Sequence, residues 1–107
     1  RGTALLNFGN SKTASLTFGF DNMYQSKYVI WGTKGIITLE RAFALPPGLK
    51  PTCILEKQGF KEVYELEPCD HFIEEIKYFY NNYENRNEKE NWYKEAINQA
   101  KALNSLL

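Results

Sequence analysis

The chain has 107 residues and a net charge of zero, with 13 Lys and Arg against 13 Asp and Glu. This balance gives no electrostatic reason to expect a nucleic acid or an anionic membrane as the partner. The length predicts one domain, and the absence of any apolar run of about 18 residues excludes a membrane-spanning helix. The first residue is Arg1, not Met, and it leads directly into a strand-like run, so we expect a fragment or a processed product.

Cysteine and histidine are too few for the common crosslinked or metal-bound folds. The chain has two cysteines, Cys53 and Cys69, and one histidine, His71. Two cysteines do not make a disulfide framework, and three possible ligands cannot fill a four-ligand zinc site. We therefore expect no metal site and, from this cysteine usage, a cytoplasmic location.

Two strand-like segments open the chain. Residues 3–8 predict a first strand that ends at Gly9-Asn10-Ser11. Residues 13–21 alternate more regularly, with Ala14, Leu16, Phe18 and Phe20 on one side. Because small or polar residues occupy the other side, the period of two predicts a half-buried strand.

The segment from Lys27 to Arg41 predicts a hairpin whose two-residue loop is Thr33-Lys34. In that register the facing pairs are Gly32–Gly35, Trp31–Ile36, Ile30–Ile37, Val29–Thr38, Tyr28–Leu39 and Lys27–Glu40. One face of the hairpin is then apolar throughout and resembles a core; it consists of Tyr28, Ile30, Ile37 and Leu39. The opposite face is too apolar for an ordinary solvated surface, and it consists of Val29, Trp31, Ile36 and Thr38.

Breaker residues and a change of period divide the rest of the chain. Pro46-Pro47-Gly48 ends regular structure, and residues 52–58 and 61–67 predict a second hairpin around Gln58-Gly59-Phe60. After Pro68 the apolar residues recur at helical spacing, which predicts a helix from the N-cap Asp70 to about residue 84. The polar run 81–91 predicts a linker, with Asn87 and Glu90 as a capping box. A last helix is expected over residues 92–107.

Six strands followed by two helices predict an α+β fold, a mostly antiparallel open sheet of about six strands with both helices on one face. Two helices cover only one side of such a sheet. The central hairpin is apolar on both sides, so its second face needs a partner subunit or an absent domain. We therefore predict a subunit interface at Val29, Trp31, Ile36 and Thr38.

Four features suggest chemistry, and each has a plainer explanation. The segment 32–35 (Gly-Thr-Lys-Gly) lacks the spacing of a phosphate-binding loop and precedes a strand, so a hairpin turn is favoured. Cys69 lies before a helix but has no fixed base. Asp70 and Glu74 beside His71 are explained as helix cap and dipole residues. Arg41 has the charge to attract an anionic substrate, although a solvated strand end is the favoured interpretation.

Three segments in this order resemble the C-terminal domain of the Gfo/Idh/MocA oxidoreductases, the relatives of glucose–fructose oxidoreductase and inositol dehydrogenase. They are Ala-Ser-Leu-Thr-Phe-Gly-Phe (14–20), Trp-Gly-Thr-Lys-Gly-Ile-Ile-Thr-Leu-Glu-Arg-Ala-Phe (31–43) and Asp-His-Phe-Ile-Glu-Glu-Ile-Lys-Tyr-Phe (70–79). The final helix also fits, so the resemblance extends over residues 3–107. The order and spacing of the segments, more than any single motif, define it.

The resemblance implies a fragment of an NAD(P)-dependent sugar or cyclitol oxidoreductase. In that family a separate Rossmann domain binds NAD(P) and carries the catalytic lysine in a Glu-Lys-Pro segment, and further catalytic Asp and His residues precede this hairpin. None of these matches a position here, so no catalytic or cofactor-binding residue is assigned, and His71 does not take that role. The family's sheet forms one wall of the substrate cleft and packs on another subunit, which implies a homo-oligomer.

A second hypothesis comes from a different functional class. The chain could be a free-standing interaction module whose exposed sheet face binds a protein or a carbohydrate, with no reductase attached. The coding sequence upstream distinguishes the two. A Gly-x-Gly-x-x-Gly after a first strand and a later Glu-Lys-Pro support the oxidoreductase, whereas an immediate start codon supports the module.

Overall fold

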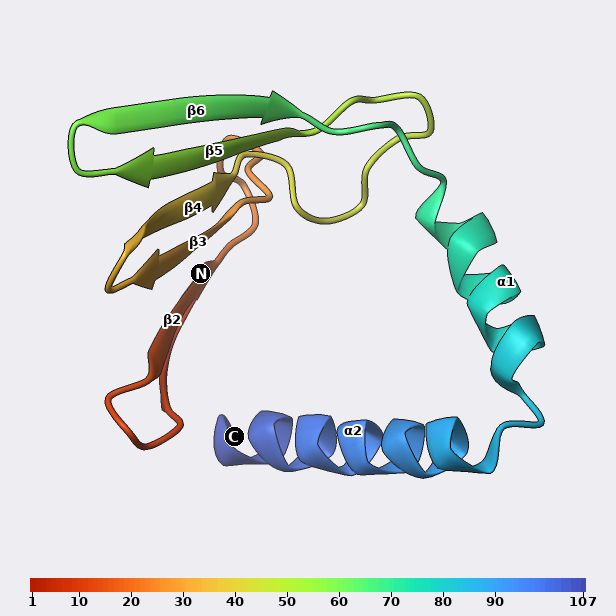
Figure 1. The fold of residues 1–107 in the computed structure, drawn as a ribbon. Helices are drawn as coiled ribbons and strands as arrows, with labels where there is room; N and C mark the ends of the chain where they lie inside the picture. The colour runs from red at the N-terminus through yellow and green to blue at the C-terminus, as the bar shows by residue number, and fades with distance from the viewer. The chain divides into compact units, whose positions relative to one another are not determined.

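The computed structural model describes all residues, 1–107, as six strands and two helices (Figure 1). The elements are β1 (Gly2–Asn7), β2 (Thr13–Phe18), β3 (Tyr28–Gly32), β4 (Gly35–Leu39), β5 (Thr52–Lys57), β6 (Phe60–Glu65), α1 (His71–Asn82) and α2 (Arg86–Ser105). They confirm the α+β class. The strands, however, form two sheets where the sequence led us to expect one: β1-β2, and β3-β4-β5-β6.

Backbone contacts divide the chain into two units, which are described separately. The first consists of Arg1–Met23 and Asn85–Leu107, and the second of Tyr24–Glu84. The first unit therefore holds the β1-β2 hairpin and α2. The second holds the four-stranded sheet and α1.

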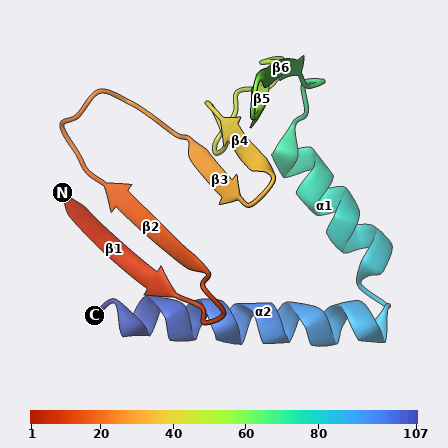
Figure 2. The ribbon, with the colours of Figure 1, turned by 60° about the vertical axis from the view of Figure 1, so that its left-hand side comes forward.

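The β1-β2 hairpin is an antiparallel pair in which Gly2 faces Phe18 and Asn7 faces Thr13 (Figure 2). The second strand ends at Phe18 instead of continuing to residue 21 as predicted. The backbone gives a cause, because Asp21 has a φ of 60°, which an extended chain cannot adopt.

The four-stranded sheet contains the central hairpin in the predicted register. Trp31 faces Ile36, Tyr28 faces Leu39, and Gly32 faces Gly35 around the two-residue loop. Gly35 is required by the neighbouring strand, because a Cβ at this position would lie 2.6 Å from the backbone oxygen of Glu56 in β5. The ladder therefore continues from β4 to β5 only with glycine here.

The second hairpin is tighter than predicted. Lys57 pairs with Phe60, so the loop contains only Gln58 and Gly59, and Phe60 is the first residue of β6. Gly59 has a φ of 70°, a conformation that glycine adopts without steric cost. This backbone conformation closes the turn one residue earlier than expected.

Side-chain caps define the start of both helices. Asp70 caps α1 as predicted, since its carboxylate accepts hydrogen bonds from the amides of Phe72 and Ile73, both at 3.2 Å. The predicted cap of α2 at Asn87 is wrong. Asn85 is the cap and accepts from the amides of Asn87 and Glu88 at 3.1 and 3.3 Å. The helix therefore begins at Arg86, and the predicted linker shrinks to residues 83–85.

No apolar side chain is fully buried in the chain as described. The hairpin face that resembled a core is half exposed, with Tyr28 at 40% and Ile30 at 53%. The extensive contacts between elements are those of the paired strands. The position of both helices over one sheet face thus remains a prediction. Neither helix has the combined length and apolarity that crossing a membrane requires.

Candidate functional site

The predicted interface residues lie on one face of the four-stranded sheet. Val29 faces Thr38 and Trp31 faces Ile36, and directly opposed residues of an antiparallel pair project to the same side. The edge strand is the most open part, with Trp31 86% exposed and Val29 52% exposed. Ile36 and Thr38 on the inner strand are half-buried.

The same face extends across β5 and β6, which sequence reasoning missed. Thr38 pairs with Ile54, and Ile54 pairs with Val63, so an apolar row that starts at Val29 crosses all four strands. Val63 is 61% exposed. The alternation within each strand was readable from sequence, but the register between β4 and β5 was not, because a twelve-residue loop (40–51) separates them. The interface candidate is therefore wider than the central hairpin.

Polar residues border this apolar row. Ile36 pairs with Glu56, which faces Lys61, and the Glu56 carboxylate lies 3.6 Å from the Lys61 ammonium. The ion pair is exposed to solvent, so it contributes little to stability. The row of facing residues that begins with Trp31 and Ile36 therefore ends in the charged pair Glu56–Lys61. The row that begins with Val29 is apolar on all four strands except at Thr38.

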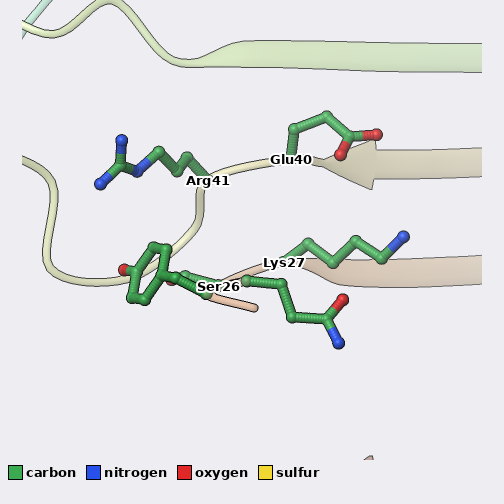
Figure 3. Close-up of a pocket in the computed structure, with 6 residues that line it drawn as sticks. Ser26, Lys27, Glu40 and Arg41 are labelled. Atoms are coloured by element: carbon green, nitrogen blue, oxygen red, sulfur yellow. The ribbon is translucent and has the colours of Figure 1, made fainter. Parts of the chain in front are cut away.

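A pocket of about 280 Å³ lies at the open end of the central hairpin, away from its turn. It is lined by Tyr24, Gln25, Ser26, Lys27, Glu40 and Arg41. An isolated bridge joins Ser26 to Arg41 beyond the last regular pair. Lys27 and Glu40, which were predicted to face each other across the hairpin and have opposite charges, form no ion pair in the structure. Figure 3 shows why: the two side chains extend alongside each other from neighbouring strands instead of meeting.

Ser26 holds the backbone that follows Arg41 beside this pocket. Its hydroxyl donates to the carbonyl of Phe43 and accepts from the amide of Phe43, both at 3.0 Å. Its own carbonyl accepts from the amide of Ala42 at 2.6 Å. Because these bonds hold residues 42 and 43 against residue 26, the Cα of Arg41 has a defined position. Sequence reasoning did not single out Ser26, since a serine before a strand has no distinctive pattern.

Arg41 is not the solvated strand end that was expected. The residue is half-buried, its Nε is buried without a hydrogen-bond partner, and its guanidinium lies 5.2 Å from the centroid of the Tyr24 ring. A cation at this distance over an aromatic face is attracted by the ring quadrupole. The pocket therefore contains an ordered cationic group.

The acidic residues beside His71 are engaged with other groups. Asp70 is engaged as the cap of α1, and the carboxylate of Glu74 lies 2.8 Å from the ammonium of Lys77. This hydrogen bond, with the charge of Glu74, raises the pKa of Lys77. The ring of His71 lies against Phe72, with centroids 4.5 Å apart. Cys69, like Cys53, is a free thiol.

Comparison with known proteins gives three relatives, all named dTDP-3,4-didehydro-2,6-dideoxy-alpha-D-glucose 3-reductase. The protein of Actinomadura kijaniata is 28% identical over 105 residues, which is 98% of this chain and 32% of the relative. That of Streptomyces antibioticus is 31% identical over 78 residues, 73% of this chain and 24% of the relative. That of Saccharopolyspora spinosa is 32% identical over 69 residues, 64% of this chain and 21% of the relative.

No family model matches the chain, and no solved structure matches it. The chain spans about a third or less of the length of the curated relatives. The similarity nevertheless extends over nearly the whole chain in the first of them. This chain is therefore homologous to part of a group of oxidoreductases whose names describe sugar-nucleotide reductases.

Proposed function

We propose that this chain is the C-terminal substrate-cleft and oligomerisation domain of an NAD(P)-dependent sugar or cyclitol oxidoreductase of the Gfo/Idh/MocA type. The observation that carries the proposal is the similarity of 105 residues to one part of a named sugar-nucleotide reductase. It agrees with the order of the three segments that resemble the C-terminal domain of this family. The intact protein would be cytoplasmic and would act on a nucleotide-linked sugar.

The chain by itself would neither bind NAD(P) nor catalyse turnover. It contains no Gly-x-Gly-x-x-Gly for the pyrophosphate of a dinucleotide and no Glu-Lys-Pro segment. The nicotinamide would supply or accept the hydride from a separate nucleotide-binding domain. The residues of this chain would shape the cleft beside the sugar and hold the subunits together.

The sheet face of Val29, Trp31, Ile36 and Thr38 supports the oligomerisation part of the proposal. A surface on which Trp31 is 86% exposed costs free energy in water, and apolar sheet faces of this kind are typical of subunit contacts. The apolar row through Ile54 and Val63 enlarges the area available for such a contact.

Two measurements test this function. Isothermal calorimetry with NADH and NADPH should give no saturable heat with the 107-residue chain, and saturable binding would contradict the proposal. The complete coding sequence should encode an upstream Rossmann domain, and its product should oxidise NAD(P)H in the presence of a dTDP-linked keto-sugar. A start codon directly before this segment would instead favour the free-standing interaction module.

A further inference from the structure

The turn that joins β1 to β2 contains an asparagine followed by a serine, Asn10-Ser11 (Figure 2). Asparagine is a thermolabile residue, because the backbone nitrogen of the next residue can attack its carboxamide carbon. A bulky next residue hinders this attack, whereas a small one permits it. In this chain only Asn10 and Asn104 are followed by a residue as small as serine. The two identical dipeptides lie in different secondary structure.

The reacting groups of the turn are open to solvent and free of hydrogen bonds. Asn10 and Ser11 are both exposed. The bonds that close the turn run from the amide of Lys12 to the carbonyl of Gly9 and from the amide of Phe8 to the carbonyl of Lys12, each at 2.9 Å. Neither the amide of Ser11 nor the carboxamide of Asn10 has a hydrogen-bond partner. The attacking nitrogen and the carbon that it attacks are therefore both accessible.

The backbone at this dipeptide has a conformation that it can leave at low cost. Asn10 has a φ of 49° and Ser11 a φ of 60°. Both are left-handed, a region that residues with a Cβ adopt at a steric penalty. Cyclisation needs a rotation about the Cα–C bond of Asn10 that brings the nitrogen of Ser11 beside the carboxamide. Exposed loops with few contacts open locally at little cost in free energy, and release of the left-handed conformation favours this opening.

Asn104-Ser105 is the internal comparison, because the same dipeptide lies within α2. Both residues are exposed there as well, so access to solvent does not separate the two sites. The helix fixes the rotation of each peptide unit, and its amides donate to carbonyls one turn earlier. The hydroxyl of Ser105 also donates to the carbonyl of Ala102 at 2.7 Å. The helical dipeptide must lose such bonds before the nitrogen can attack, whereas the turn has none to lose.

We propose that Asn10 is a site of spontaneous covalent modification, at which the backbone nitrogen of Ser11 displaces the side-chain amide as ammonia. The bond from this nitrogen to Cγ of Asn10 forms, the Cγ–Nδ2 bond breaks, and the amide proton leaves with the ammonia. Water then opens the cyclic succinimide to aspartate or isoaspartate. Each product adds a negative charge two residues before Lys12, and isoaspartate also lengthens the backbone of the turn. This reactivity is independent of the oxidoreductase function proposed above.

The test is incubation of the 107-residue chain at mildly alkaline pH, with peptide mapping by mass spectrometry at a series of times. Replacement of the carboxamide by a carboxylate raises the mass of the peptide, and chromatography separates isoaspartate from aspartate. We expect Asn10 to convert at least about fivefold faster than Asn104, the factor that corresponds to one hydrogen bond lost from the helix. In concentrated guanidinium chloride the two rates should become similar, because both dipeptides are then unfolded.

Ser11→Gly is the matched variant. Glycine adopts the φ of residue 11 without steric cost, so the turn is kept. The missing side chain should raise the rate at Asn10 and leave the rate at Asn104 unchanged. Cross-strand resonances between β1 and β2 at the start of each incubation establish that the hairpin is folded. Equal rates at the two asparagines of the folded chain, faster conversion at Asn104, or no acceleration in Ser11→Gly would overturn the proposal.

Discussion

The two sheets begin from similar sequence patterns and differ in what surrounds them. The β1-β2 hairpin is a two-stranded sheet, whereas the β3-β4 hairpin continues through β5 into a sheet of four strands. An isolated two-stranded hairpin is marginally stable in water, and further strands supply the cross-strand contacts that stabilise it. Alternation along a strand therefore indicates that the strand pairs with another. The number of neighbouring strands decides how strongly a substitution in it changes the stability of the sheet.

Matched glycine substitutions should show this difference most strongly. Gly35→Ala places a Cβ 2.6 Å from a backbone oxygen of β5, and backbone cannot move without breaking the β4-β5 ladder. We expect a loss of about 2–3 kcal/mol in the free energy of unfolding. Gly2→Ala in the other hairpin meets only the ring of Phe18, which can rotate away, so its loss should be smaller. Chemical denaturation of both variants measures these losses. Equal losses of stability in the two variants would contradict the expected difference between the sheets.

Self-association should depend on one sheet and not on the other. Trp31→Lys places a charge on the proposed interface, and we expect association to weaken by at least about tenfold. Phe18→Lys, at an exposed aromatic residue of β2, is the control and should leave association unchanged. Sedimentation over a range of concentrations measures both. A strictly monomeric parent chain, or equal effects of the two variants, would refute the interface at Val29, Trp31, Ile36 and Thr38.

Side-chain hydrogen bonds to the backbone should matter in both units, with the larger effect beside the pocket. Ser26→Ala removes two bonds to Phe43, and we expect a loss of about 1–2 kcal/mol in stability. Asn7→Ala removes a single bond of 2.9 Å to the amide of Gly9, so its loss should be about half as large. Thermal unfolding of the two variants measures the two losses of stability. A smaller effect for Ser26→Ala would mean that residues 42 and 43 are held by other contacts.

The smallest expected effects are at residues with a left-handed backbone conformation. Here a substitution should raise the stability of the chain instead of lowering it. Ala44 has a φ of 50° and Asn10 a φ of 49°. Asparagine tolerates this region better than alanine, because its short side chain can hydrogen-bond locally. Ala44→Gly should therefore stabilise the chain by about 0.5–1 kcal/mol, and Asn10→Gly by less. Denaturation midpoints that fall for Ala44→Gly would contradict this expectation.

The errors of sequence reasoning share one cause. The cap of α2 was assigned to Asn87 because of the spacing to Glu90, but Asn85 makes the bonds. Both are asparagines in one polar run, and the residue that adopts extended φ and ψ before the helix becomes the cap. Likewise, the strand expected over residues 13–21 ends at Phe18, before Asp21 with its φ of 60°. A local pattern describes what a segment can form, and its neighbours decide where it stops.

By itself the sequence determined the six strands, the two helices and the register of the central hairpin from Tyr28–Leu39 to Gly32–Gly35, because side-chain period and a two-residue loop act over short distances. It also determined the resemblance to an oxidoreductase domain. Only the tertiary structure decided that the strands divide between two sheets, that the apolar face continues through Ile54 and Val63, and that Arg41 is half-buried over Tyr24. The physical reason is that these features depend on pairing and burial between segments far apart in the chain. Local periodicity carries no record of such contacts.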